Sequence, residues 1–145
     1  MSCNPFPQKQ CLEFCDDRAI IKAEEKKKQF IGKNKTHKLF SKFRVDNCLI
    51  KEGRKCDFLI LDCEGQKAYF IELKGKDLLS ALEQIDHSID VLFRYLGNYR
   101  VNARIVLSKV NVPNLRSTEY IKLEKKIKWL KGNVLVKDRV LEENL

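Results

Sequence analysis

Two short apolar runs followed by a long amphipathic segment constrain this chain most. Cys56–Asp62 and Ala68–Lys74 have strand-like composition, and a turn segment containing Gly65 separates them. In Leu78–Leu96, leucine and isoleucine recur every three or four residues, which is the spacing of one helix face. A further apolar strand is expected at 103–110. Because a helix this long favours a crossover connection, the sequence predicts an α/β fold with a mixed sheet.

The pairing of the first two strands brings charged residues together. A symmetric hairpin that pairs Asp62 with Lys67 also places Asp57 opposite Glu72. Two neighbouring carboxylates repel each other unless a cation lies between them, and Mg²⁺ prefers such oxygen ligands. Strand alternation puts Lys74 on the same face as Glu72. The pattern therefore predicts a small metal site with a lysine beside it.

These residues resemble the signature of a known superfamily. Asp57, fourteen further residues and then Glu72-Leu73-Lys74 are similar to the D…(D/E)xK motif of the PD-(D/E)xK nucleases, over roughly residues 43–108. Cys56 stands where many members have proline. The resemblance implies a restriction-endonuclease-like αβββαβ core, with a mixed central sheet flanked by helices and followed here by a C-terminal helix and strand. It also implies a Mg²⁺-dependent nuclease, with a resolvase of branched DNA as an alternative function.

The resemblance assigns a role to each site residue. Asp57 and Glu72 would ligate Mg²⁺ or Mn²⁺, with the backbone carbonyl of Leu73 completing the coordination. Lys74 would orient the attacking water and offset charge on the phosphate. Gln84 matches a glutamine that faces the active site in the RecB-like branch, although a surface glutamine is the ordinary alternative.

A third acid depends on how the N-terminal region folds. Ala19–Lys28 reads either as a helix, which would complete the αβββαβ core, or as parts of strands. As a helix it would offer Glu24 or Glu25 to the metal. The next strand is expected at Phe43–Ile50, where Asp46 is a secondary candidate that only a bulge would turn toward the site.

The excess of positive charge indicates an acidic partner. The formal net charge is +9, from 29 Lys and Arg against 20 Asp and Glu, and nucleic acid, with DNA favoured, is the usual partner of such a surface. A basic helix is expected from Ser117 or Thr118 to Gly132, with a last strand at Asn133–Val140 and Trp129 in the core. The candidate nucleic-acid-binding residues are Lys76, Lys122, Lys125, Lys126 and Lys128. The alternative for the charge is a solvated basic surface. The alternative for the function is a catalytically silent nucleic-acid-binding or protein-interaction module on the same fold.

Length and cysteine usage suggest the organisation and location of the chain. The 145 residues are expected to form one domain, with 1–10 as a flexible arm. Without an apolar span or a signal-peptide pattern, the protein is expected to be cytoplasmic. Its six cysteines are accordingly expected to be free thiols, with zinc binding near Cys11 and Cys15 as a minor alternative. A domain this small commonly acts as a homodimer or beside a targeting partner.

Overall fold

The computed structural model describes every residue except 1–2, 74, 76 and 111. In the described residues the strands form a six-stranded sheet in the order β1-β4-β5-β6-β7-β8 and a three-stranded sheet in the order β2-β3-β9. The large sheet contains β1 (Leu12–Asp16), β4 (Phe40–Arg44), β5 (Phe58–Asp62), β6 (Lys67–Glu72), β7 (Arg100–Leu107) and β8 (Val134–Asp138). The small sheet contains β2 (Ile20–Glu25), β3 (Lys28–Lys33) and β9 (Val140–Asn144).

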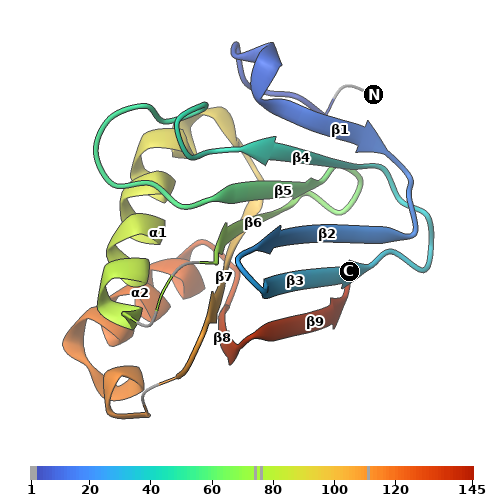
Figure 1. The fold of residues 1–145 in the computed structure, drawn as a ribbon. Helices are drawn as coiled ribbons and strands as arrows, with labels where there is room; N and C mark the ends of the chain where they lie inside the picture. The colour runs from blue at the N-terminus through green and yellow to red at the C-terminus, as the bar shows by residue number, and fades with distance from the viewer. Residues whose placement is uncertain (1–2, 74, 76, 111) are drawn as a thin grey trace.

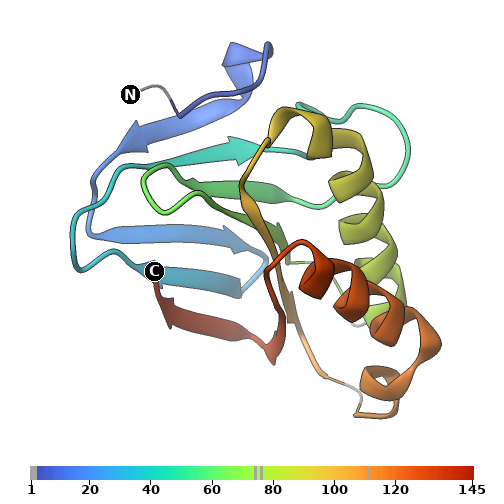
Figure 2. The ribbon, with the colours of Figure 1, turned by 180° about the vertical axis from the view of Figure 1, so that it is seen from behind.

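Helices cover one face of the large sheet and the small sheet covers the other (Figure 1). The two helices are α1 (Leu78–Leu92), which continues into a 3₁₀ turn at Phe93–Tyr95, and α2 (Thr118–Trp129). Figure 2 shows the same layers from behind, with both helices on the side away from β2, β3 and β9. The expected α/β class with a mixed sheet is therefore confirmed, because β4, β5 and β6 pair antiparallel whereas β6, β7 and β8 pair parallel.

The central hairpin has the predicted register. Asp62 pairs with Lys67, and the ladder continues to Phe58 opposite Ile71. The residues of β6 point alternately to the two faces of the sheet. Ala68 and Phe70 pack with the α1 stripe, whereas Tyr69 and Ile71 pack under the small sheet.

Helix α1 follows its sequence pattern closely. Asp77 is its N-cap and accepts a hydrogen bond from the Ser80 amide at 3.3 Å. The periodic apolar residues are all buried: Leu78, Leu82, Ile85, Ile89, Leu92 and Leu96. Ser117 likewise caps α2, accepting from the Tyr120 amide at 3.2 Å. None of the helices in the described part of the chain is both long and apolar enough to cross a membrane.

The alternative helix at Ala19–Lys28 is wrong, because this region forms the β2–β3 hairpin. Lys26 and Lys27 turn the chain with φ of 46° and 67°, a left-handed conformation that is uncommon outside glycine and asparagine. Ile21 and Phe30 then face the core beneath the small sheet. The first helix of the expected αβββαβ core consequently has no counterpart at this place in the chain.

Two other expected strands are displaced. The strand expected at Phe43–Ile50 begins earlier, as β4, and ends at Arg44, after which the chain turns. At the C-terminus, the last strand expected at Asn133–Val140 is divided into β8 and β9. Arg139, at φ 62°, lies between them, and β9 leaves the large sheet to pair parallel with β3.

The N-terminal segment, expected to be a flexible arm, is packed from Cys3 onward. Phe6 is buried and makes edge-to-face contacts with Phe43 and Tyr95 at centroid distances of 5.0 and 5.5 Å. Cys3 forms a disulfide with Cys63. This segment therefore closes one end of the core.

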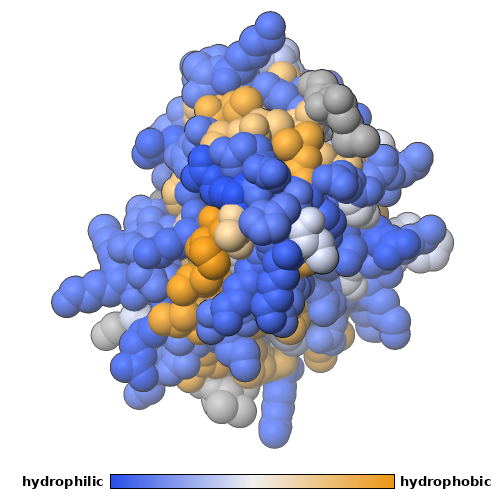
Figure 3. Space-filling view, turned by 90° about the vertical axis from the view of Figure 1, so that its right-hand side faces the viewer, coloured by the Kyte–Doolittle hydropathy of each residue, from blue (hydrophilic) through white to orange (hydrophobic). Residues whose placement is uncertain are grey.

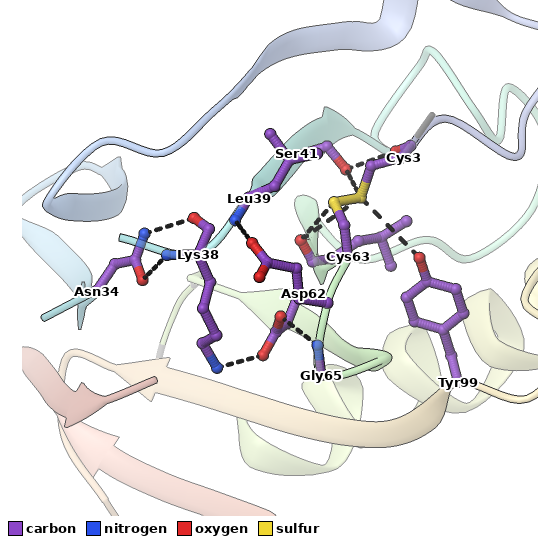
Figure 4. The surroundings of a disulfide bond; sticks show 11 residues. Cys3, Asn34, Lys38, Leu39, Ser41, Asp62, Cys63, Gly65 and Tyr99 are labelled. Atoms are coloured by element: carbon purple, nitrogen blue, oxygen red, sulfur yellow. Dashed lines mark hydrogen bonds and ion pairs between the residues drawn. A yellow bond between two sulfur atoms is a disulfide. The ribbon is translucent and has the colours of Figure 1, made fainter. Parts of the chain in front are cut away.

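Figure 4 shows how the surroundings of the Cys3–Cys63 disulfide are built. The Ser41 hydroxyl donates to the Cys3 carbonyl at 2.8 Å. Next to Cys63, the buried Asp62 carboxylate accepts from the Lys38 ammonium at 2.7 Å and from the Gly65 amide at 2.8 Å. The cross-link therefore lies within an ordered polar network.

A second disulfide joins Cys11 to Cys48. The expectation of free thiols is correct only for Cys15, which is exposed, and Cys56, which is buried. The zinc alternative is wrong, because Cys11 is bonded to a residue outside the proposed cluster. On the outside of the molecule, the face in Figure 3 is mostly hydrophilic with separate hydrophobic areas, consistent with the high content of charged residues.

Candidate active site

Asp57 lies immediately before β5 and is 2% exposed. Its amide donates to the Ile71 carbonyl at 3.0 Å, and its Oδ2 accepts from the Leu73 amide at 2.8 Å. The bonds therefore hold Asp57 against the backbone on both sides of Glu72. The regular ladder stops one pair earlier, at Phe58 and Ile71, so Asp57 is bonded to the neighbours of Glu72 and is not a ladder partner of Glu72 itself.

Glu72 ends β6 and is fully buried on the helix side of the sheet. The hydrogen-bond network assigns the Gln84 amide so that its nitrogen faces two acceptors. In this orientation Gln84 Nε2 donates to Glu72 Oε2 at 3.0 Å and to the Lys55 carbonyl at 2.8 Å, while its oxygen accepts from the Ser80 hydroxyl at 3.1 Å. Gln84 therefore points from α1 toward Glu72.

Ser88 fastens the same helix to the strand that carries Asp57. The buried Ser88 hydroxyl donates to the Gln84 carbonyl at 2.8 Å and accepts from the Cys56 amide, also at 2.8 Å. Ser88 is one helical turn beyond Gln84, so both residues lie on the same side of α1. Gln84 and Ser88 together fix the distance between α1 and the ends of the two strands.

The Cys56 thiol responds to both carboxylates. Burial raises its pKa, and the negative charges of Glu72 and then of Asp57 raise it further. Cys56 is thus an inert, protonated thiol at neutral pH rather than a nucleophile. Cys56 therefore lies close to both acids.

Asp46 also lies beside Asp57. It follows the end of β4, and its amide, like that of Val45, is directed at the Asp57 carbonyl, at 3.4 and 3.0 Å respectively. Asp46 is half-buried. The turn, rather than the bulge considered from the sequence, brings it close.

Glu24 is turned to other partners. It lies on β2, forms an ion pair with Lys22 at 2.8 Å and accepts from Gln29 at 2.7 Å. Glu25, the other candidate, ends the same strand and not a helix. The helix that was to carry a third acid toward the metal is therefore replaced by a strand of the small sheet.

The remaining candidate site residues are Leu73 and two lysines. Leu73 is buried, and its amide is bonded to Asp57. Lys74 and Lys76 lie outside the described residues. Within the described ranges, no group of three or more His, Cys, Asp and Glu side chains is arranged to hold a metal ion. The donor set in view is the Asp57 and Glu72 carboxylates with the backbone at Leu73.

The basic helix presents only part of its charge to solvent. Lys122, Lys125 and Lys128 are exposed. Lys126 instead bonds Asp86 and Asp90 of α1, at 2.6 and 2.5 Å. Burial opposes the charge of Lys126, but these carboxylates outweigh it and raise the pKa of the ammonium group. Lys126 is thus a link between the helices rather than a free phosphate contact.

Two residues that the sequence reasoning missed belong to this site. Ser88 connects Gln84 to Cys56, and Lys55 supplies the carbonyl that Gln84 contacts. Ser88 had a usable signal, because it lies four residues after Gln84 on the same helix face. Lys55 had none, since its contribution is a backbone carbonyl.

Replacement of Gln84 by leucine tests whether Gln84 positions Glu72. The change removes the donor to Glu72 and to the Lys55 carbonyl, so we expect about 1–3 kcal/mol less stability from the unsatisfied buried acceptors. Any metal-dependent activity should fall roughly 10- to 100-fold, as for other groups that orient a ligand. Denaturant unfolding and activity assays measure the two effects.

The matched control is Gln29→Leu, which breaks a glutamine–glutamate bond at the molecular surface. We expect less than about 0.5 kcal/mol from this control and unchanged activity. Equal effects of the two variants would show that Gln84 is an ordinary surface residue.

Comparison with known proteins adds no relative to this picture. No protein family matches the chain, and neither the curated proteins nor the solved structures contain a significant match.

Proposed function

We propose that this protein is a metal-dependent nuclease that hydrolyses phosphodiester bonds of nucleic acid, with DNA favoured as substrate. The observation that carries the proposal is the convergence of three predicted residues from separate elements. Asp57 contacts the backbone on both sides of Glu72, and Gln84 reaches Glu72 from α1. These residues are also the ones in the resemblance to the PD-(D/E)xK superfamily.

The donor chemistry fits a hard divalent cation. Mg²⁺ and Mn²⁺ take oxygen ligands, and Mg²⁺ is commonly held by one or two carboxylates together with waters and substrate phosphate. Asp57 and Glu72 would provide the carboxylates, and Leu73 its carbonyl oxygen. Two carboxylates that lie close together at the ends of neighbouring strands are a donor set of the kind that holds such a cation.

Each residue of the site would have its own role in the reaction. When bound, the metal polarises the scissile phosphate and lowers the pKa of the attacking water. Gln84 would hold the Glu72 carboxylate in one orientation through its amide nitrogen. Lys74 would orient the water and offset negative charge that develops on the phosphate in the transition state. The exposed lysines of α2 would contribute phosphate contacts that do not depend on sequence.

Cleavage is expected to require Mg²⁺ or Mn²⁺ and to stop on addition of EDTA. The assay uses linear, circular, single-stranded and branched DNA, and RNA, each with both metals. Glu72→Gln protein purified in parallel is the control for a contaminating nuclease, because the amide keeps the size of the side chain and an oxygen that can accept from Gln84. Cleavage that persists in EDTA, or equally in the Glu72→Gln preparation, would rule the mechanism out.

One observation favours the alternative, a catalytically silent module that binds nucleic acid. Glu72 is fully buried and Asp57 is 2% exposed, so the described atoms enclose both carboxylates. In that case the site residues would stabilise the junction of β5, β6 and α1. The module would bind DNA through the basic surface and cleave none of the substrates in the panel.

A further inference from the structure

The C-terminal end of α2 carries a large aromatic side chain that is exposed to solvent. Trp129, expected in the core, is 86% exposed, and Phe93 at the end of α1 is 44% exposed. Both rings and Leu130 border two adjoining hollows of about 290 and 280 Å³. Large exposed aromatic residues at one place on a surface are a common sign of a binding site.

Cations adjoin these rings on one side. Arg100 and Lys131, both exposed, line the first hollow together with Trp129 and Phe93. The same two residues line a third hollow of about 370 Å³ that also contains Lys67 and Asn133. Arg104 at its base is already engaged by Glu143, with Nε to Oε1 at 2.5 Å. The aromatic surface is thus continuous with a polar hollow whose rim carries three cations.

The two acids that line these hollows are both held by cations of the protein. Asp90 lines the second hollow, but it is paired with Lys126. Glu143 lines the third hollow and is paired with Arg104. In the part of the surface that the structure describes, a ligand would therefore meet unpaired positive charge. This charge lies along the path from Trp129 through Arg100 and Lys131 to Lys67.

Backbone contacts fix the arrangement. The Val101 amide donates to the Leu130 carbonyl at 3.2 Å, and the Asn133 amide donates to Asn102 Oδ1 at 3.0 Å. Between them, Gly132 lies so close to β7 that a Cβ atom would be 1.7 Å from the Val101 carbonyl oxygen. Lys131 has a φ of 69°. The segment after α2 is therefore held against the start of β7, as the ribbon in Figure 2 shows. Trp129 and Lys131 consequently line one hollow together with Arg100.

We propose that this surface, defined by Trp129, Phe93, Arg100, Lys131 and Lys67, binds single-stranded nucleic acid. An unpaired base stacks on the exposed face of Trp129, and the neighbouring phosphates lie on Arg100 and Lys131. Single strands fit better than duplex, because the faces of bases inside a duplex are covered by their neighbours. A protein partner fits less well, because it would bury the cations beside the rings without the regular negative charge of a phosphate backbone.

The surface is distinct from the carboxylate site. Arg100 begins β7, and Ile105 of the same strand pairs with Glu72. At about 3.3 Å per residue, the two places are roughly 16 Å apart along the strand. If the proposed nuclease function holds, the substrate class is a nucleic acid with a single-stranded stretch. The binding itself does not depend on that function, since no residue of the carboxylate site takes part.

The only tryptophan of the chain reports on the proposed contact directly. Titration of the protein with a thymidine oligonucleotide in EDTA should quench Trp129 fluorescence, and a duplex of the same length should quench it far less. Trp129→Ala should weaken binding of a dye-labelled single strand about 5- to 150-fold, measured by anisotropy, while Trp129→Phe retains most of it. Ile121→Ala is the control, because Ile121 is 43% exposed on the same helix but borders none of the three hollows.

The cationic half is tested by Arg100→Gln combined with Lys131→Asn, asparagine being chosen because it tolerates positive φ. Loss of two phosphate contacts should flatten the slope of log K against log salt by about 1.4. Lys9→Gln with Lys35→Gln removes the same charge from exposed positions elsewhere and should leave that slope unchanged.

Three results would overturn the proposal. They are an absence of quenching by any single strand, equal affinity for duplex and single strand, and equal weakening by the test and control variants. Because these titrations contain EDTA, any such result would leave the question of metal-dependent cleavage untouched. Conversely, an inactive Glu72→Gln protein should still bind the single strand with unchanged affinity.

Discussion

Asp57→Asn is expected to reduce metal-dependent cleavage at least about 10³-fold while leaving the fold intact. The loss should exceed the 10- to 100-fold typical of groups that only orient a ligand, because the metal loses a charged donor. The asparagine oxygen can still accept from the Leu73 amide, which bonds Asp57 Oδ2 at 2.8 Å in the wild type. Removing one of two nearby buried negative charges should keep the free energy of unfolding equal to that of the wild type or raise it.

Activity and stability separate the two interpretations of this carboxylate. Denaturant unfolding of Asp57→Asn without metal, together with cleavage assays at saturating Mg²⁺, measures both. Asp16→Asn is a useful control, because Asp16 forms an exposed ion pair with Arg18 and lies on an outer strand of the sheet. If Asp57→Asn unfolds the protein, or loses more than about 2 kcal/mol of stability, the residue is structural.

Reduction of the two disulfides is expected to have the second large effect. The cross-linked residues are 60 and 37 positions apart. Chain-entropy estimates for loops of this size give roughly 4 kcal/mol for each link. Domains of this kind are stable by about 5–15 kcal/mol in total, so the fully reduced protein should be marginal at 37 °C. Thermal unfolding with and without a strong reductant measures the difference.

Single replacements show which link matters. Cys63→Ser and Cys48→Ser each open one loop, whereas Cys15→Ser removes an exposed free thiol and should change nothing. Identical unfolding curves for oxidised and reduced protein would show that the cross-links do not contribute. The Cys11–Cys48 link deserves a separate activity measurement, because Cys48 lies in the turn whose Val45 amide bonds the Asp57 carbonyl at 3.0 Å.

The cross-links also bear on where the protein is expected to work. Disulfides are typical of oxidising compartments and of intracellular proteins of hyperthermophiles, and are rare in other cytosols. Two disulfides in a protein expected to be cytoplasmic would therefore be typical only of a hyperthermophile. The oxidation state of the cysteines in cells, measured by thiol alkylation, tests this expectation.

The sequence was most informative where local chemistry and burial agree. The β5–β6 register followed from a short turn and alternating side chains, and it correctly paired Asp62 with Lys67. The α1 helix followed from its apolar stripe and the Asp77 cap. The resemblance singled out Gln84 on this helix, and in the structure its amide contacts Glu72.

The predictions were wrong where contacts between distant parts of the sequence determine the structure. The β2–β3 hairpin turns at Lys26–Lys27, where neither glycine nor asparagine signals positive φ. The apolar residues of that hairpin are buried against the large sheet and against β9, both of which come from later parts of the chain. The disulfide partners are likewise decided by the fold, since the spacing of cysteines does not specify connectivity. Trp129 lies outside because α2 presents Leu123 and Ile127 to the core instead.

Direct binding of Mn²⁺ tests the central claim, that Asp57 and Glu72 form a metal site. Isothermal titration or electron paramagnetic resonance of the substrate-free protein gives stoichiometry and affinity without any assumption about the substrate. We predict about one Mn²⁺ per chain in the wild type and at least a tenfold weaker site in both Asp57→Asn and Glu72→Gln, with unchanged binding in Asp16→Asn. No binding by the wild type, or equal binding by all four proteins, would contradict the account.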